Sequence, residues 1–501
     1  MKPTRRDMLR FGSALVLAPA ARCSRVALKP EVPAPAAPDE TIVNDIHSQL
    51  NRTVVDRVIR PGAVEQLCDA VVTARARGRF ISVCGRRHSM GGQQFGAGTT
   101  LIDLTGLNRV LSLNRENGVV EMEAGVEWPE LLAYLRAAQQ DGETNWGIMQ
   151  KQTGADRLSI GGALASNVHG RGLTFKPLID QIESFTLIDQ RGELRRCSRP
   201  ENAELFRLAI GGYGLFGIVT SVRMRLWPRK KVERVVEIRD LKDIPGAFAL
   251  RIADGYLYGD FQYATDSNRD SFMRRGVFST YRPVDPATPI TRNQIRFHPD
   301  DWARLTYYTH KYKRRAFDVY TKRYLETSGQ IYWSDSQLSA AYKDDYHREL
   351  DRKLGAKDKG SEMITEIYVP RASLISFMET AREELKRRRA NVIYGAVRLI
   401  EKDEESFLAW AREPWACIIF NLHIDHTPQK IEVAAAAFRG LIDIAIAHQG
   451  SYYLTYHRWA GREQLEKCYP RFREFLALKR KHDPDELFQS DWYRHHREMF
   501  A

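Results

Sequence analysis

Several common sequence signatures are absent from this chain, and each absence excludes a class of protein. No apolar run reaches the ~20 residues that a membrane-spanning helix requires, so we expect no transmembrane anchor. The six cysteines form no C-x-x-C pair and show no metal-ligand spacing, and we expect them to be buried free thiols. No G-x-x-x-x-G-K-[ST] run occurs, which excludes a P-loop nucleotide-binding protein.

The composition that remains suits a two-domain protein with a basic surface. The chain has 501 residues, 43% of them hydrophobic, and a formal net charge of +13, and this length is typical of two domains. Its densest basic stretches, residues 310–315 and 386–389, are typical of charged helix faces, and no nucleic-acid motif accompanies them. A basic protein could favour an anionic substrate, a membrane face or a nucleic acid. We predict a small-molecule substrate and no nucleic-acid partner.

Residues 1–25 have the pattern of a twin-arginine export signal. Arg5 and Arg6 precede a short apolar segment at residues 11–18, and Ala18-Pro19-Ala20 offers a small-residue cleavage site. A basic amphipathic start is the alternative interpretation. Residues 26–41, rich in proline and alanine, predict a flexible linker. The pattern predicts a periplasmic or secreted protein.

A histidine in a glycine-containing turn is the most informative local feature. Residues 62–77 have the apolar spacing of a one-faced helix, and residues 80–83 are typical of a short buried strand. Residues 82–93 follow, with His88 between Gly85 and the pair Gly91-Gly92. Glycine turns let backbone N–H groups point at phosphate oxygens. The unit predicts a phosphate-cradling loop with a cofactor-anchoring histidine; the alternative is a surface loop with an incidental histidine.

Two further runs of small residues favour the first interpretation. Residues 154–170 hold almost no bulky side chain, so their backbone can pack flat against a rigid group. In residues 209–222, four glycines lead into a β-branched strand. Between these runs, residues 182–189 and 194–197 flank a turn at Gly192 and predict a hairpin.

The three runs, in this order, resemble the FAD-binding domain of the vanillyl-alcohol oxidase and p-cresol methylhydroxylase superfamily. The resemblance implies that the first turn wraps the pyrophosphate of FAD, the second run packs beside the flavin and the third lies by the adenine. It implies an FAD-binding domain at residues 42–228. The implied cofactor-binding residues are Gly85, Arg86, Arg87, His88, Ser89, Gly91, Gly92, Gln93, Ser159, Gly161, Gly162, Ser166, Asn167, His169, Gly170, Gly217, Ile218 and Val219.

His88 matches the histidine that some members of the superfamily bond covalently to the flavin 8α-methyl group. Such a bond prevents loss of the cofactor and raises its redox potential. Arg87 departs from the pattern, because many relatives have glycine there, so a differently shaped loop with non-covalent FAD is the alternative. Members with a second link use a cysteine near the middle run, and none lies between Cys84 and Cys197. We predict at most one covalent bond.

The second half predicts a substrate domain at residues 229–467. Candidate strands at residues 363–369, 392–400 and 416–423 alternate with helical patterns at 371–387 and 431–448, which predicts a mixed sheet with helices on one side. This half resembles the cap domain of sugar-alcohol, aldonolactone and decaprenylphosphoryl-ribose oxidases. Residues 468–501 resemble their closing segment, which implies a tail that returns to the FAD domain. The expected fold class is α+β.

Candidate catalytic residues come from the strands of the cap. The resemblance places Arg398 in an E-x-R pair of the alditol oxidases, although Ala396 replaces the glutamate. His423, His457 and Tyr456 lie where relatives carry a lysine or histidine, and a histidine can accept a proton near neutral pH. Each of these histidines could also be a structural hydrogen-bonding group.

A metal site is not expected from the sequence. His423, Asp425 and His426 suggest one by composition, but alternation along a strand would put His423 and Asp425 on one face and His426 on the other. We predict no metal.

Together these patterns predict a flavoprotein that oxidises a C–OH bond of a sugar, alditol, lactone or other alcohol. Its electrons would pass from FAD, for which His88 is the candidate covalent attachment point, to oxygen or another acceptor. Two alternatives stay open. One is amine oxidation like that of the cytokinin dehydrogenases, and the other is a flavin-binding or other binding module without turnover. The sequence defines neither the substrate nor the oligomeric state.

Overall fold

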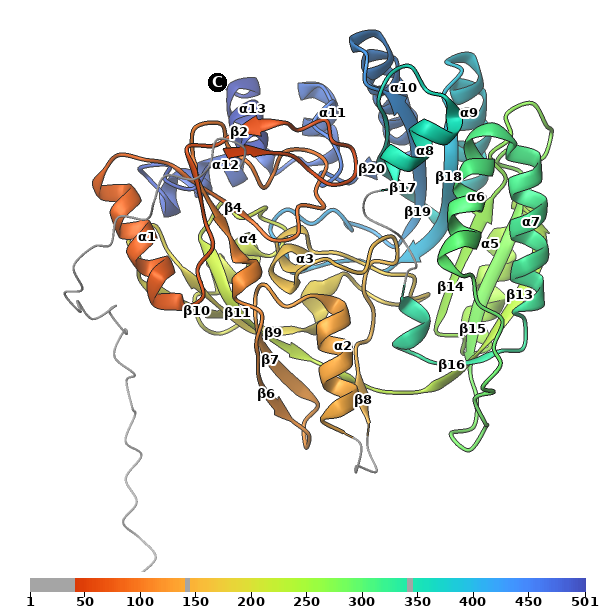
Figure 1. Ribbon diagram of the computed structural model, residues 1–501, viewed down its shortest axis with the longest axis horizontal. Coiled ribbons are helices and arrows are strands. Elements are labelled where there is room, and N and C mark those ends of the chain that lie inside the picture. Colours follow the sequence, from red (N-terminus) through yellow and green to blue (C-terminus); the bar gives the residue numbers. More distant parts are fainter. Residues whose placement is uncertain (1–40, 140–144, 340–345) are drawn as a thin grey trace, which may run out of the picture.

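The computed structural model describes residues 41–139, 145–339 and 346–501. The predicted export signal and the linker up to residue 40 lie outside the described residues. The fold is α+β, as predicted. The first half, which the sequence predicts to bind FAD, is called the FAD-binding half here, and the second half is built on a large antiparallel sheet. The two halves lie side by side, orange to yellow and green to blue (Figure 1).

The chain begins with a small parallel sheet. Strand β3 (Arg57–Ile59) is followed by helix α1 (Val64–Ala76), strand β4 (Ile81–Cys84) and strand β5 (Thr100–Asp103), in the spatial order β3-β5-β4. Helix α1 buries Leu67, Cys68, Val71 and Ala74, which confirms the predicted one-faced helix. The segment containing His88 leaves the carboxyl end of β4. A two-stranded ladder of β1 (Ile42–Val43) and β2 (Thr53–Val54) lies before β3.

A five-stranded antiparallel sheet completes the FAD-binding half. Its order is β10-β9-β11-β7-β6, and the predicted hairpin is confirmed as β9 paired with β10, with Ile188 opposite Leu194. Gly212, Gly214 and Gly217 have the G-x-G-x-x-G spacing, but they connect a helix to a strand, the reverse of a dinucleotide-binding βαβ unit. The elements are β6 (Val110–Asn114), β7 (Val119–Glu123), α2 (Trp128–Ala137), α3 (Ile160–Ser166), β9 (Ile182–Ile188), β10 (Leu194–Ser198), α4 (Ala203–Ala209) and β11 (Ile218–Arg225), with a small ladder of β8 (Trp146–Gly147) and β12 (Trp227–Pro228).

The second half is built on an eight-stranded sheet in the order β16-β13-β15-β14-β18-β19-β17-β20. The three strands expected from the sequence are confirmed in it. Every pairing in the described part of this sheet is antiparallel, so the predicted mixed sheet is wrong. The strands are β13 (Lys231–Asp240), β14 (Tyr258–Tyr263), β15 (Arg275–Pro283), β16 (Ile331–Trp333), β17 (Gly360–Pro370), β18 (Val392–Ile400), β19 (Trp415–Asp425) and β20 (Ser451–Tyr452).

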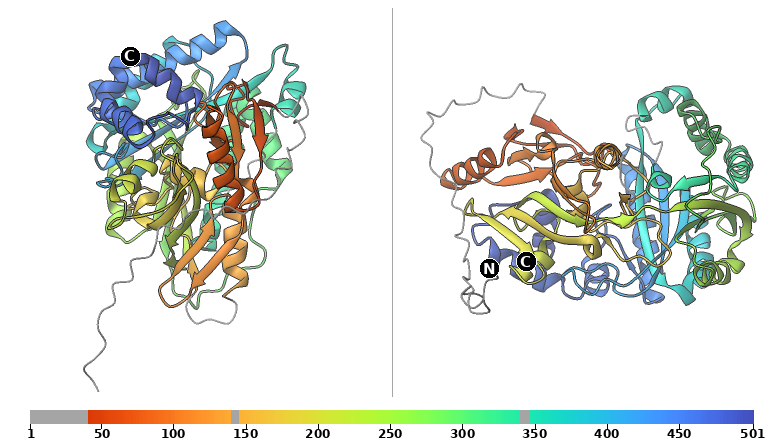
Figure 2. Two further views of the ribbon diagram at one scale, coloured as in Figure 1. Left: turned by 90° about the vertical axis from the view of Figure 1, so that its left-hand side faces the viewer. Right: turned by 90° about the horizontal axis from the view of Figure 1, so that it is seen from below.

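Helices cover both faces of this sheet, which corrects the prediction of helices on one side (Figure 2, right). On one face lie α5 (Ile244–Ala253), α9 (Leu374–Arg387) and α10 (Pro428–Ala447), which pack Phe248, Phe377 and Phe438 into the main hydrophobic core. On the other lie α6 (Pro299–Lys311), α7 (Lys313–Glu326) and α8 (His347–Leu354). In the α6–α7 segment the sequence indicated only a charged helix face at residues 310–315, and the bounds of the two helices come from the structure.

The C-terminal segment returns to the FAD-binding half. Helices α11 (Arg462–Cys468), α12 (Phe472–His482) and α13 (Asp491–Met499) lie beside it (Figure 1). The Ile81 N–H donates to the Leu487 carbonyl at 2.8 Å and the Gln489 N–H donates to the Ile81 carbonyl at 2.8 Å. The segment thus adds a short parallel bridge beside β4.

The cysteines are mostly as predicted. Cys84, Cys197, Cys417 and Cys468 are buried free thiols. Cys68 is in a disulfide, which corrects the prediction for that residue, because a spacing pattern in the sequence cannot show which distant cysteines meet.

Candidate active site

A cavity of about 1910 Å³ connects the two halves of the molecule. Its lining includes the turn after β4, residues around α3 and residues of β14, β17, β18 and β19, together with Tyr213, Gly214, Gly217 and Val219. Pockets for drug-sized ligands measure roughly 300–1,000 Å³. This cavity therefore has room for a large cofactor together with a substrate.

The cavity wall on the FAD-binding side contains glycines that pack closely against neighbouring atoms. A Cβ atom on Gly85 would lie 2.1 Å from Oγ of Ser159. Gly217 has φ +142, and a Cβ there would lie 2.6 Å from the Ile188 carbonyl oxygen. A larger residue at either position would require neighbouring atoms to move. This glycine-lined, elongated wall fits a dinucleotide such as FAD.

Most of the residues predicted to bind the cofactor line this cavity. They are Gly85, Arg86, Arg87, His88, Ser89, Gln93, Ser159, Gly161, Gly162, Ser166, His169, Gly217 and Val219. Gly91, Gly92, Asn167, Gly170 and Ile218 are not part of its lining. Asn167 instead joins segments of the fold, because its side chain donates to Asp403 and accepts from the Ile179 N–H, both at 2.9 Å.

His88 is held on both ring nitrogens. Its Nε2 lies 3.1 Å from the Arg157 carbonyl oxygen, and its Nδ1 lies 2.7 Å from Nε2 of His47. A carbonyl oxygen only accepts, so Nε2 of His88 carries the proton and Nδ1 carries the lone pair. Burial, reinforced by His47, holds the pKa of His88 well below its usual value. The ring is therefore neutral, with Nδ1 as its nucleophilic atom.

Arg87 takes the backbone conformation that glycine takes most easily. Its φ is +60, in the left-handed region that non-glycine residues rarely adopt. Its guanidinium lies 3.4 Å from Asp103, which holds the residue in place. The turn therefore keeps a glycine-like backbone although the sequence has arginine.

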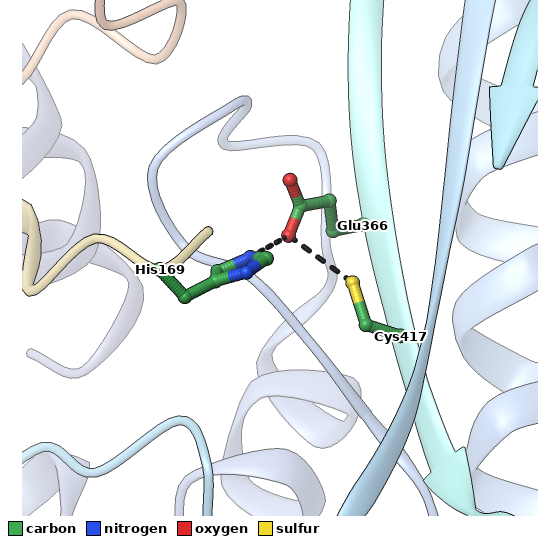
Figure 3. Close-up of side chains that lie close together, drawn as sticks. All are labelled: His169, Glu366 and Cys417. Carbon is green, nitrogen blue, oxygen red and sulfur yellow. Dashed lines mark hydrogen bonds and ion pairs between the residues drawn. The ribbon is translucent and has the colours of Figure 1, made fainter. Parts of the chain in front are cut away.

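A buried carboxylate, Glu366, forms the polar centre of the opposite wall (Figure 3). Its Oε2 accepts from Nε2 of His169 at 2.6 Å and contacts Sγ of Cys417 at 3.5 Å. Tyr456 donates to Oε1 at 2.7 Å, and Tyr368 donates to Oε2 at 3.1 Å. Burial alone would raise the pKa of Glu366, but His169 and Tyr456 lower it to about 2. Glu366 is thus ionised at neutral pH.

Glu366 was not predicted from the sequence, because its role depends on the register of three strands. Ile419 on β19 pairs with Ala396 on β18 and with Glu366 on β17. The carboxylate therefore lies in the same cross-strand row as Ala396, two strands away, at roughly 10 Å by strand spacing. A lone acidic residue inside the apolar strand at 363–369 was the available signal, since such residues are rarely buried without a function or partner.

Two buried polar atoms on the sheet wall of the cavity have no partner among the described residues. Arg398 donates from Nη2 to Oγ1 of Thr153 at 2.6 Å, but its Nε makes no hydrogen bond, and neither does Oδ1 of Asn421. Unpaired buried polar atoms are costly in a folded protein. Here they offer one donor and one acceptor to a bound molecule.

The predicted catalytic residues fall into two groups. Arg398 and Tyr456 line the cavity. His457 lies on the other face of β17, where its Nε2 is 3.1 Å from Oγ1 of Thr365, and burial lowers its pKa to about 3. His423 is directed at Glu362, with Nδ1 3.4 Å from that carboxylate. The geometry brings only the first pair to the cavity.

Beyond Glu366, the cavity continues under α6 and α7 into an aromatic region. Trp302, Tyr307 and Tyr308 of α6 and Tyr320 and Tyr324 of α7 are among its walls. Aromatic rings bind the apolar faces of ring-shaped ligands and offer hydroxyl groups at their edges.

The chain is similar in sequence to several known proteins. The FAD binding domain family matches residues 55–198. An L-gulono-1,4-lactone dehydrogenase of Mycobacterium tuberculosis is 24% identical over 440 residues, which cover 87% of this chain and 95% of the relative. The chain is an FAD-linked oxidoreductase with a PCMH-type FAD-binding domain. This confirms the family resemblance.

Other relatives of this FAD-linked oxidoreductase match over shorter lengths. An L-gulonolactone oxidase of Bos taurus is 28% identical over 37% of this chain and 40% of the relative. Cytokinin dehydrogenase 9 of Oryza sativa subsp. japonica is 28% identical over 36% of this chain and 35% of the relative. Among the residues that the structure describes, no helix is both long and apolar enough to cross a membrane.

Proposed function

We propose that this oxidoreductase oxidises a secondary or primary C–OH group of a lactone, sugar or sugar alcohol, with FAD bound in the cavity and attached to His88. The observation that carries the proposal is the single cavity joining the glycine-lined wall and His88 to Glu366 and Arg398. Bound FAD would supply a two-electron acceptor that takes hydride from carbon and passes the electrons to oxygen or another acceptor.

The residues on the sheet wall account for binding and proton removal. Arg398, charged and with an unpaired Nε, binds a substrate oxygen. Tyr456 takes the hydroxyl proton of the substrate and passes its own proton to Glu366, to which its hydroxyl already donates. Glu366 is ionised and relays that proton to solvent in the cavity, because a carboxyl group with a pKa of about 2 does not retain it. Proton relays of this kind contribute typically 10²–10⁴-fold to a rate.

His88 is the attachment point in this proposal. Bound FAD would be held by Nδ1 of His88 through its C8-methyl group, and this attachment would be an oxidation in which dioxygen or another acceptor takes up two electrons and two protons. A neutral ring with its lone pair on Nδ1, as the contacts with Arg157 and His47 indicate, is the form that can make this bond.

The lengths of the sequence alignments favour oxidation of a C–OH group over oxidation of an amine. The lactone dehydrogenase aligns across both halves of this chain, whereas the cytokinin dehydrogenase aligns over about a third of it. The substrate is selected by the second half, so the longer match bears on it more directly. Export by the twin-arginine route, on the pattern in residues 1–25, belongs to the same proposal.

The proposal is tested by mixing the yellow protein anaerobically with aldonolactones, aldoses, alditols and, as the competing class, adenine-type secondary amines. Bleaching of the flavin absorption by a member of the first three groups is expected. Bleaching by amines alone contradicts C–OH oxidation. Protein that carries flavin, is reduced by dithionite and yet is bleached by no substrate supports a flavin-binding module without turnover.

A further inference from the structure

A second cluster of ionisable side chains lies outside the flavin cavity. Glu362, on the same strand and face as Glu366, is four residues and roughly 13 Å away. His310 of α6 places Nε2 3.0 Å from its Oε1, and His423 of β19 places Nδ1 3.4 Å from the same atom. The ligand atoms of these three residues all lie within 4.8 Å of one another. Three separate elements therefore bring two imidazoles and a carboxylate to one point.

A third histidine borders the cluster without a hydrogen bond. His347, at the start of α8, is 2% exposed. Its Nδ1 lies 3.1 Å from Oε2 of Glu362, yet neither of its ring nitrogens has hydrogen-bond geometry with any described group. An imidazole always carries at least one N–H, so a buried ring of this kind is left unsatisfied. It is directed at the same carboxylate as the other two histidines.

The outer nitrogens of the first two histidines have the contacts that metal-bound histidines usually have. Nδ1 of His310 lies 2.8 Å from the Thr306 carbonyl oxygen, and Nε2 of His423 lies 3.4 Å from Oδ1 of Asp425. Backbone carbonyl or carboxylate partners of this type orient the ring and raise its basicity as a ligand. Both rings therefore turn their other nitrogen toward Glu362.

The spacing also suits a small divalent cation. Ligand atoms bound at about 2.0–2.1 Å in a tetrahedron are roughly 3.3 Å apart, close to the 3.0 and 3.4 Å found here. Imidazole nitrogen with one carboxylate oxygen is a donor set typical of zinc. Its positive charge would also neutralise a carboxylate that is 2% exposed.

We propose that His310, Glu362 and His423 bind one Zn²⁺ ion, with His347 as the fourth ligand. The proposal replaces the expectation from the sequence that no metal is present. The ion joins α6 and α8 to β17 and β19. Because α6 also forms part of the aromatic wall of the cavity, the metal fixes that wall on the sheet. A site closed by four protein ligands is structural and not catalytic.

The first test measures metal in protein purified through a tag without histidines, after growth with added Zn²⁺. About one zinc per chain is expected in the wild type, and less than about a tenth of that in Glu362→Gln and His310→Asn. His347→Asn is expected to weaken retention during dialysis against a chelator. The matched control is His426→Asn, because Nε2 of His426 lies 2.7 Å from Oγ of Ser361 and His426 is not part of the cluster around Glu362, so this variant is expected to keep its zinc.

Anomalous scattering from crystals of the wild-type protein at the zinc edge tests the position without any variant. The peak is expected between His310, Glu362 and His423. Wild-type protein that retains no zinc after incubation and gel filtration overturns the proposal. So does a peak at His169, Glu366 and Cys417, or equal metal loss in His426→Asn. Flavin content is read separately from absorption, so failure here does not affect the proposed oxidation.

Discussion

The two walls of the cavity are built on opposite principles. The FAD-binding wall depends on missing side chains, because Gly85 and Gly217 lie where a Cβ would meet neighbouring atoms. The sheet wall depends on side chains that are present, Glu366, Arg398 and Tyr456, which come from distant parts of the chain. Residues of the first kind of site form short runs in the sequence. Residues of the second kind come together only when the strands pair in their native register.

Substitution of Gly217 by valine should have the largest effect, since it breaks the backbone-based wall. A β-branched residue at φ +142 is strained, and its Cβ would meet the Ile188 carbonyl oxygen. We expect a loss of about 4 kcal/mol or more in the free energy of unfolding and little flavin-loaded protein. Flavin absorption per folded chain and urea unfolding measure both.

Gly154→Val is the matched control for that experiment. Gly154 lies in the second glycine-containing run and lines the cavity, but no atom lies within 4 Å of a Cβ built there. This variant should keep the wild-type free energy of unfolding. An equal loss of stability in both variants would contradict this prediction, because it would mean that the glycine runs tolerate no side chain even where no atom is nearby.

Glu366→Gln should break the sheet wall without disturbing the other one. Glutamine keeps the shape but cannot take the substrate proton, so we expect a fall in the rate of flavin reduction of about 10²–10⁴-fold with full flavin content. Stopped-flow reduction by the substrate found in the anaerobic screen measures it. Thr365→Val, the next residue along β17 and on its other face, should reduce flavin at nearly the wild-type rate.

The contrast between the walls also explains what the sequence could predict. Local periodicity located α1, the β9–β10 hairpin and the three central strands of the large sheet, and the glycine runs located most of the cofactor wall. Three residues were missed because their partners are far away in the sequence and leave no local pattern. His47 contacts His88 across 41 positions, Glu366 contacts His169 across 197, and Glu362 contacts His310 across 52. The mixed sheet was predicted wrongly because strand direction depends on connections that periodicity does not encode.

His457, on the far face of β17, should affect stability and its pH dependence. Its pKa is about 3 in the folded protein and about 6.5 when unfolded. Between these values the unfolded chain binds the extra proton, so stability falls as the pH falls from 6.5 toward 3, by about 1.4 kcal/mol per pH unit for this residue. Urea unfolding at pH 7, 6 and 5 should show a shallower dependence in His457→Asn, and parallel curves would contradict this.

The smallest change in stability is expected at Arg87, where two substitutions can be compared. Arg87→Gly and Arg87→Ala both lose the contact with Asp103, but only glycine removes the cost of a positive φ. We expect the glycine variant to be more stable than the alanine variant by about 1 kcal/mol, with flavin retained in both. An alanine variant as stable as glycine in urea unfolding would indicate that the turn relaxes to another conformation.

The central claim is that FAD lies in the cavity bonded to His88. Acid precipitation of the purified protein, followed by absorption spectra of pellet and supernatant, tests it most directly, with His88→Ala alongside. We predict yellow colour in the wild-type pellet and flavin released from the variant. Flavin released into the supernatant from wild-type protein as well would contradict the covalent bond.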